Sequence, residues 1–296
     1  MCKPIYILAF LFIFAQACEE PVEIQLPEEE MQLVVQAELS PDKGIVLNLT
    51  KSISGINITQ PKPVEEANIK ISENGREYIN EQTSSINIQP LYANLAAGSE
   101  YGLIVEVPGF ENVYAHDQIP AQIPFSNFDE LYYHQAEVFY VDEENHSKTI
   151  DFHVHVRFNE PREIKNFYHL IARPILQETS TDVFLQATHI RGNDNLLEIQ
   201  NDFKQGLLFS DLSNTAGTMR LEFFVRTVMD LEVNVDDIAF EIETRNVSPA
   251  YYKFHSSVSS NIASSNPYAD PSVLESNIKN GLGAFVAYNP TIIRTR

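Results

Sequence analysis

The stretch Thr149-Ile-Asp-Phe-His-Val-His-Val-Arg-Phe158 alternates apolar and polar side chains along most of its length. Because successive side chains of a strand point to opposite faces, this period of two predicts a half-buried β-strand. Its apolar side chains then share one face, and His153 and His155 share the other. Residues 131–141 form a similar run, and the polar residues 142–146 between the two runs predict a turn. The sequence therefore predicts a long antiparallel hairpin.

Short strand patterns also fill the N-terminal part of the chain. Runs with a period of two recur between residues 32 and 116, separated by turn signals such as Ser40–Gly44 and Glu73–Gly75. About seven such strands with frequent turns are typical of an antiparallel sandwich of immunoglobulin type. The Cys–Trp–Cys core of antibody domains is missing, so the prediction for residues 31–120 concerns the architecture alone.

The C-terminal part combines strands with one helix. Strand patterns continue from residue 131 to residue 244, beyond the proline-rich linker 119–124. Ser248-Pro249 has the residue types of a helix N-cap followed by proline at the first helical position, and helical spacing follows over 250–262. We therefore expect an all-β fold, with an immunoglobulin-like sandwich and a larger C-terminal antiparallel β domain, residues 125–296, that carries the helix.

The N-terminus has the features of an export signal. Residues 1–17 combine Lys3, the apolar run Ile5–Phe14 and a small-residue ending, as a secretory signal peptide does. A run of about ten apolar residues is too short to cross a hydrocarbon core of about 30 Å. Cys18 stands where a bacterial lipoprotein is cleaved and lipidated, so we expect an exported, lipid-anchored protein. The alternative is an ordinary cysteine that follows a cleaved leader.

The segment after this cysteine is strongly acidic. Residues 18–30 include Glu19, Glu20 and two prolines, a composition that predicts an extended tether between the lipid and the domain. The whole chain carries a formal net charge of −21. Since nucleic acids and anionic membranes attract basic surfaces, this charge excludes nucleic acid as an expected partner. It is typical of a soluble exported domain, with recognition of a cationic ligand as the alternative.

The sequence carries none of the common catalytic signatures. It has no Gly-x-Ser-x-Gly elbow, no glycine-rich phosphate loop and no dinucleotide fingerprint. The one cysteine outside the leader is the expected lipid anchor. Asp236 and Asp237 offer paired carboxylates for hydrolase chemistry, but adjacent residues of a strand point to opposite faces, and a solvated turn is the interpretation we favour. We expect no enzyme activity and no cofactor.

Two histidines form a candidate metal site. His153 and His155 share one strand face and can ligate a metal if a neighbouring strand supplies a third ligand. His134 on the preceding strand and His169 on the following strand are the candidates. The alternative, which we favour from the sequence, is a polar strand face that uses histidine without binding a metal.

The stretch from residue 266 to residue 285 is irregular, with two prolines and two glycines. We interpret it as a loop that closes the second domain, with a recognition loop as the alternative. The structural interpretation expects glycine-specific backbone angles at Gly281 and Gly283 and a last strand over residues 284–287. It also expects Ile278 and Phe285 to be buried beside the helix, and Tyr288 to be exposed.

Several motifs occur in the closing, opening and middle parts of the chain: Asn266-Pro-Tyr, Pro271-Ser-Val, Ser276-Asn-Ile-Lys-Asn-Gly-Leu-Gly-Ala-Phe285, Cys18-Glu-Glu, Ile24-Gln-Leu-Pro27, Leu33-Val-Val-Gln-Ala37, Pro63–Ile69 and Tyr101-Gly-Leu103. Together they resemble the motifs of a lipoprotein family of Bacteroidota, domain of unknown function 4249. The closing motif is the most specific, and the opening and middle motifs agree with it. The resemblance implies an outer-membrane lipoprotein, often encoded beside a TonB-dependent receptor. It also implies that Glu19 and Glu20 form a surface-export signal. It supplies no catalytic residue.

These observations lead to three hypotheses of function. The first is a non-catalytic outer-membrane lipoprotein at the cell surface, which acts as an accessory or ligand-capturing component of a TonB-dependent uptake system. The second is a structural or assembly lipoprotein of the envelope. The third is a surface hydrolase that uses carboxylates. No residue pattern identifies the ligand.

Overall fold

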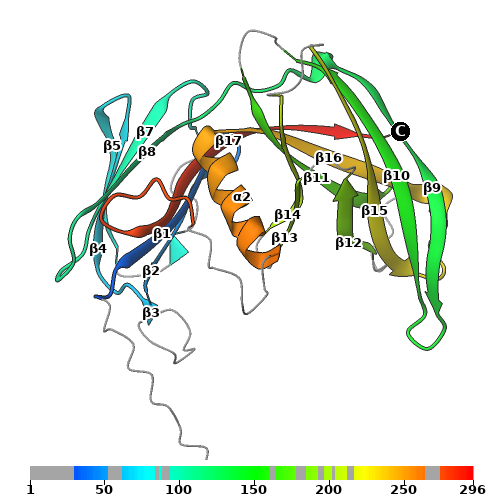
Figure 1. The fold of residues 1–296 in the computed structure, drawn as a ribbon, viewed down its shortest axis with the longest axis horizontal. Coiled ribbons are helices and arrows are strands. Elements are labelled where there is room, and N and C mark those ends of the chain that lie inside the picture. The colour runs from blue at the N-terminus through cyan, green and yellow to red at the C-terminus, as the bar shows by residue number, and fades with distance from the viewer. Residues whose placement is uncertain are drawn as a thin grey trace, which may run out of the picture.

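The computed structural model describes residues 30–52, 62–83, 87–88, 94–160, 165–177, 185–192, 197–201, 204–211, 217–263 and 274–295. The expected signal peptide, Cys18, Glu19 and Glu20 lie outside these residues, as does the start of the closing stretch. The described part is mostly β with a single helix, as the sequence predicts (Figure 1).

The elements follow one another in this order: β1 (Leu33–Ser40), β2 (Gly44–Lys51), β3 (Lys62–Pro63), β4 (Ala67–Glu73), β5 (Arg76–Thr83), β6 (Asn87–Ile88), β7 (Glu100–Glu106), β8 (Val113–Gln118), η1 (Phe125–Asn127), β9 (Phe128–Asp142), β10 (Ser147–Asn159), β11 (Phe167–Leu176), β12 (Leu185–Gly192), β13 (Leu197–Asn201), β14 (Lys204–Ser210), β15 (Thr218–Asp230), η2 (Val235–Asp237), β16 (Ile238–Val247), α2 (Pro249–Ala263) and β17 (Leu282–Arg294).

The described strands form three sheets. One long sheet runs β13-β14-β11-β16-β17-β1-β2-β3, with β6 also paired to β2; the others run β5-β4-β7-β8 and β12-β15-β10-β9. The join in the long sheet is β17, which pairs parallel with β1 and antiparallel with β16. The last strand of the chain thus lies beside the first, and the long sheet continues across the expected boundary between residues 31–120 and 125–296.

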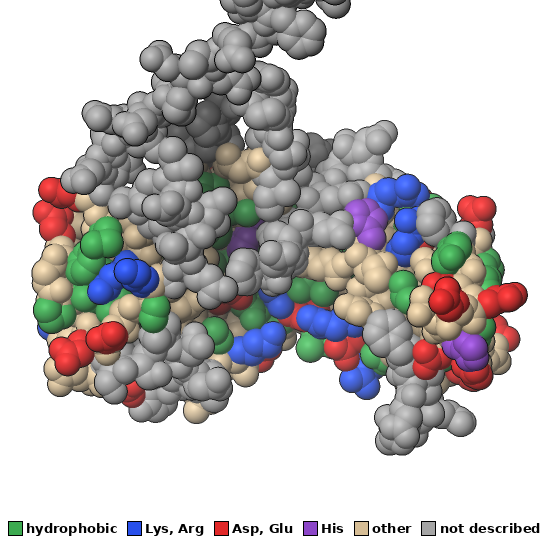
Figure 2. Space-filling model, turned by 90° about the horizontal axis from the view of Figure 1, so that it is seen from below, with side chains coloured by type: hydrophobic (Ala, Val, Ile, Leu, Met, Phe, Trp, Pro, Cys, Tyr) green, Lys and Arg blue, Asp and Glu red, His purple; other side chains and the backbone are tan. Residues whose placement is uncertain are grey.

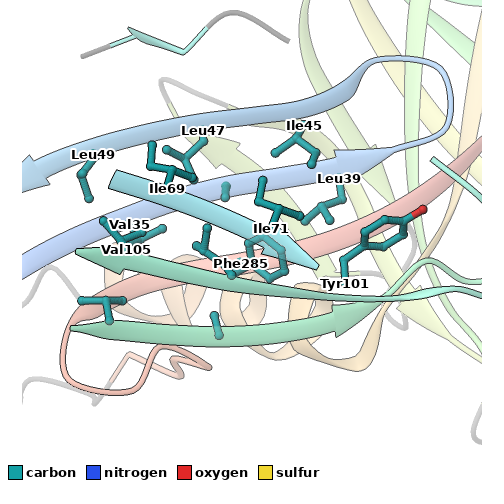
Figure 3. Close-up of a cluster of buried hydrophobic side chains, with 14 of the residues drawn as sticks. Val35, Leu39, Ile45, Leu47, Leu49, Ile69, Ile71, Tyr101, Val105 and Phe285 are labelled. Atoms are coloured by element: carbon teal, nitrogen blue, oxygen red, sulfur yellow. The ribbon is translucent and has the colours of Figure 1, made fainter. Parts of the chain in front are cut away.

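The first sandwich packs one half of the long sheet on β5-β4-β7-β8. Period-two strands bury one face each, so side chains from both sheets interdigitate in a single core. Phe285 of β17 lies inside this core, among residues of β1, β2, β4 and β7 (Figure 3). The predicted hairpin turn between β4 and β5 is present: Asn74 and Gly75 both have positive φ, as a type I′ turn requires.

The second sandwich packs the other half of the long sheet on β12-β15-β10-β9. Strand β10 buries every second residue from Ile150 to Phe158 and pairs with β9 in the predicted long hairpin. Facing side chains from β11, β14 and β16 complete this core. The alternation in residues 149–158 therefore corresponds to a half-buried strand, as the sequence predicts. One face of the strand lies in the core and the other faces solvent.

Helix α2 covers the outer face of the long sheet between the two sandwiches (Figure 1). It begins as the sequence predicts: the Tyr251 backbone N–H donates to the Ser248 hydroxyl at 3.1 Å, an N-cap bond. Tyr251 and His255, one turn apart, form its most buried positions. Strand β16 is therefore covered on both faces and is buried at nine of ten positions.

The closing segment differs from the expectation in four respects. Ile278 and Phe285 are buried, but Phe285 faces the first-sandwich core rather than α2. Tyr288 is 2% exposed, so the expectation of an exposed side chain is wrong. Its ring lies 4.3 Å from the Arg245 guanidinium, on the face that α2 covers.

The two glycines of the closing segment differ in their backbone angles. Gly283 has φ +101°, whereas Gly281 has no positive φ. A Cβ at Gly281 would lie 2.9 Å from the Leu33 carbonyl oxygen, so close packing rather than backbone angle favours glycine there. Strand β17 also extends well beyond residues 284–287 at both ends.

A buried carboxylate joins the first sandwich to the start of the helix. Asp117 of β8 accepts hydrogen bonds from the Ser248 hydroxyl and from the Ala287 N–H of β17, at 2.5 and 2.7 Å. Burial raises the pKa of Asp117 to about 6, although these hydrogen bonds favour the charged form. Residues of β8, α2 and β17 thus meet at one titratable group.

We expect Asp117 to make the stability of the protein depend on pH. Its pKa rises from 3.8 in the unfolded chain to about 6 in the fold, so the folded state holds the proton more tightly. Its contribution to stability is therefore greatest below about pH 4 and falls, by roughly 1–3 kcal/mol, as the pH rises through 6. In urea unfolding between pH 4.5 and 7.5, Asp117→Asn should remove this fall, and the exposed-site control Asp236→Asn should retain it. An identical pH slope in wild type and Asp117→Asn would contradict the assignment.

Candidate functional site

The outward surface of the sheet β12-β15-β10-β9, around His134, His153 and His155, is the strongest candidate site; we call it the histidine face. Antiparallel pairing places His153 of β10 opposite His134 of β9 on one side and Phe224 of β15 on the other. On the next outward position, His155 lies opposite Tyr132 and Glu222. Two adjacent rows across three strands therefore hold three imidazoles.

The three imidazoles are close together. One ligand atom from each of His134, His153 and His155 lies within 4.8 Å of the others. The other candidate third ligand, His169, is elsewhere: β11 pairs with β14 and β16 rather than with β10. Its Nδ1 lies 2.8 Å from the Tyr251 hydroxyl beneath α2. The predicted pair and the predicted partner on β9 thus meet, and His169 does not join them.

Aromatic side chains hold two of these rings in place. The His155 ring stacks on Tyr132, with centroids 4.5 Å apart and planes 13° from parallel. The His153 ring stacks in the same way on Phe224, at 4.6 Å and 11°. The Arg191 guanidinium lies 5.2 Å from the centroid of Phe224. These stacks restrict the orientations of the two imidazoles before any ligand arrives.

The electrostatics favour a neutral imidazole at His153. Partial burial lowers the pKa of His153 below its usual 6.5, and the neighbouring His155 and His134 lower it further by charge repulsion. Neutral imidazole has a free nitrogen lone pair, which is the form that binds metals. Shallow depressions lie on both sides of the cluster, one bordered by Tyr132, His155 and Glu222 and the other by Phe224 and Arg226.

Fixed ion pairs surround the histidine face. Arg157 contacts Asp129 and Glu130 at 2.7 and 2.6 Å, and Arg226 contacts Asp151 at 2.8 Å. Acidic side chains gather towards both ends of the molecule when it is seen from below (Figure 2). The surface therefore combines local charge pairing with the overall acidity of the chain.

The paired carboxylates predicted at residues 236 and 237 lie in the short 3₁₀ turn η2. Both are exposed, and the Asp236 backbone N–H donates to the side chain of Asn234. This is the solvated turn that we favoured. Asp236 and Asp237 do not belong to the histidine face.

A different carboxylate pair was not predicted. Glu160 follows β10 and Asp211 follows β14, and both are buried. Burial raises the pKa of Glu160, and its interaction with Asp211 raises it further. The Tyr168 hydroxyl donates to Glu160 at 2.7 Å, and the Asn166 backbone N–H donates to Asp211 at 3.0 Å. Because 51 residues separate the carboxylates, no local sequence pattern could have identified the pair.

Among the described residues, no helix has the length and the apolar character that a bilayer span requires.

Comparison with known proteins places the chain in a family. No match was found among curated proteins. A family model matches residues 19–294, which is nearly the whole chain; the match begins one residue after Cys18 and includes the closing motif. The chain therefore belongs to the family described as a domain of unknown function, DUF4249.

Proposed function

We propose that this protein is a non-catalytic lipoprotein of the outer membrane of Bacteroidota, exposed at the cell surface, that serves as an accessory or ligand-capturing component of a TonB-dependent uptake system. The observation that carries the proposal is Cys18, which stands at the end of an apolar leader and is followed at once by an acidic segment. Glu19 and Glu20 would direct the anchored protein to the surface.

The fold is well suited to a tether at its N-terminus. The tether would lead into β1, which is an interior strand of the long sheet. Strand β1 pairs with β17 from Val34 to Leu39 and with β2 along its whole length. A pull on the tether would therefore load two ladders of hydrogen bonds in parallel.

The position of the histidine face also supports a capturing role. Figure 1 places the start of β1 at one end of the molecule and the strands β9, β10 and β15 at the other. A protein held by its N-terminus would present this surface away from the anchor, where a ligand or a receptor could reach it. Functional residues on a rigid scaffold remote from the anchor are what a capture module needs.

Cys18→Ala tests the anchor and the partner in one experiment. We expect native protein, carrying a C-terminal affinity tag, to co-purify from detergent-solubilised outer membranes with a TonB-dependent receptor. Because the variant has no thiol to lipidate, it should leave the membrane fraction or remain as an uncleaved precursor. It should also no longer co-purify with the receptor. Mass spectrometry of the protein and of its partners checks both outcomes.

Two results would contradict the proposal. Normal processing and membrane association of Cys18→Ala would remove the lipoprotein assignment. Anchored wild-type protein that co-purifies with envelope components but with no receptor would favour the structural lipoprotein. A double variant, Glu19→Ala with Glu20→Ala, serves as the topology control: it should stay anchored but become protected from protease added to intact cells.

The Glu160–Asp211 pair is the observation that favours a surface hydrolase as the second candidate. The pKa of Glu160 is raised, and a carboxyl group of this kind beside a second carboxyl group can hold a proton for acid catalysis. Both side chains are buried and bonded to Asn166 and Tyr168, which is also what a structural pair requires. Glycosidase turnover that is lost in Glu160→Gln would favour this candidate over the first.

A further inference from the structure

We propose that His134, His153 and His155 form a binding site for a divalent transition metal of the Zn²⁺ type on the histidine face. The inference rests on the positions of these side chains and holds whether or not the protein is a lipoprotein. It replaces the preference for a polar strand face, because the fold brings the imidazole of His134 to the same place as those of His153 and His155.

The distances suit a metal after small side-chain rotations. In a tetrahedral zinc site with Zn–N bonds of about 2.0–2.1 Å, ligand nitrogens lie about 3.3 Å apart. Here the ligand atoms already lie within 4.8 Å of one another. The backbone positions are set by the pairing of His134 with His153 across β9 and β10. His134 is exposed, so its ring can turn towards the other two without disturbing the core.

Glu222 stands where a carboxylate would orient one of the ligands. Its Oε1 lies 3.7 Å from Nδ1 of His155, close enough to accept a hydrogen bond after a slight rotation. Within the described part of the chain, the buried Nε2 of His155 has no hydrogen-bond partner. Metal-binding histidines usually donate one ring N–H to a carboxylate and bind the metal through the other nitrogen. After that rotation His155 would have this arrangement, with Nε2 as the metal-binding nitrogen.

The chemistry of the cluster selects the class of metal. Three imidazoles suit zinc, copper, nickel or iron, whereas calcium and magnesium prefer oxygen ligands. Three protein ligands leave a fourth position open for water or for a group on a bound molecule. A site of this kind on an exposed sheet can bind the metal ion alone. It can also bind a molecule that coordinates the same metal ion through the open fourth position.

Calorimetric titration with Zn²⁺ tests the site. The full chain, without a polyhistidine tag and freed of metal with a chelator, should bind one Zn²⁺ per chain. Its melting temperature should rise by several degrees with zinc, because a ligand of the folded state stabilises it by mass action. In His134→Ala and in His155→Ala, we expect the affinity to fall at least about tenfold and the rise in melting temperature to disappear.

Two control variants separate the metal site from general effects. His116→Ala removes an exposed histidine of β8, in the other sandwich, and should bind zinc like wild type. Glu222→Gln keeps all three imidazoles and should weaken binding less than the loss of a ligand, as expected for a positioning residue. His134→Ala should melt like wild type in the presence of chelator, which shows that its fold is intact. Unchanged zinc binding in His134→Ala, equal loss in His116→Ala, or no binding by wild type would overturn the proposal.

Discussion

Gly283→Ala is expected to prevent β17 from pairing beside β1 and thereby to abolish the fold. Gly283 has φ +101°, and a Cβ built there would lie 2.0 Å from the carbonyl oxygen of Val35 in β1. Such an overlap of side chain with backbone can be relieved only by moving a strand. Since β17 pairs with both β1 and β16, we expect a loss of more than about 4–5 kcal/mol and little soluble protein.

Gly109→Ala is the matched control for this substitution. Gly109 also has a positive φ, +83°, but no described atom lies within 4 Å of the position that a Cβ would take there. Its replacement carries only the conformational penalty, roughly 1–2 kcal/mol. Soluble yield and urea unfolding should therefore separate the two variants clearly. Equal stabilities would show that β1 and β17 are not held as closely as the structure indicates.

Phe285→Ala should have the second largest effect, and it should act on the first sandwich. Phe285 is fully buried and packs among residues of β1, β4 and β7, although it lies close to the C-terminus of the chain. Truncation of a buried phenylalanine costs about 3–5 kcal/mol through lost burial and a residual cavity. We expect a loss of that size in urea unfolding, with early loss of the near-ultraviolet circular dichroism that Tyr101, a buried residue of the same core, contributes.

Leu282→Ala is the control for Phe285→Ala. Leu282 is in the same strand but is 44% exposed, so its truncation should change stability by no more than about 0.5 kcal/mol. The comparison also separates the two interpretations of the closing segment. If Phe285→Ala melted like wild type but lost binding to a partner, the segment would be a recognition surface and the packing role assigned here would be wrong.

The candidate site could be predicted from the sequence in part. The alternation in residues 149–158 places His153 and His155 on the solvent side, because side-chain direction in a strand depends on position alone. The choice between His134 and His169 depends on which strands pair with β10. Strands β9 and β15 do so, whereas β11 joins the long sheet. The predicted hairpin of residues 131–141 and 149–158 already brings His134 close to His153. The place of β11 is decided by the packing of whole sheets, so no local pattern could exclude His169.

The sequence by itself determined the features that short-range physical chemistry controls: the all-β class, the Asn74-Gly75 turn, the capped start of α2 and the faces of the half-buried strands. Strand β17 shows why local patterns were insufficient elsewhere. It is buried on both faces over most of its length, so it lacks the alternation that marks a half-buried strand, and Tyr288 was predicted to be exposed. Its pairing with β1, the contacts of the buried Asp117 and the Glu160–Asp211 pair were decided only by the tertiary structure. Each joins residues far apart in the chain, and their contacts form because both sandwiches must bury their apolar faces at once.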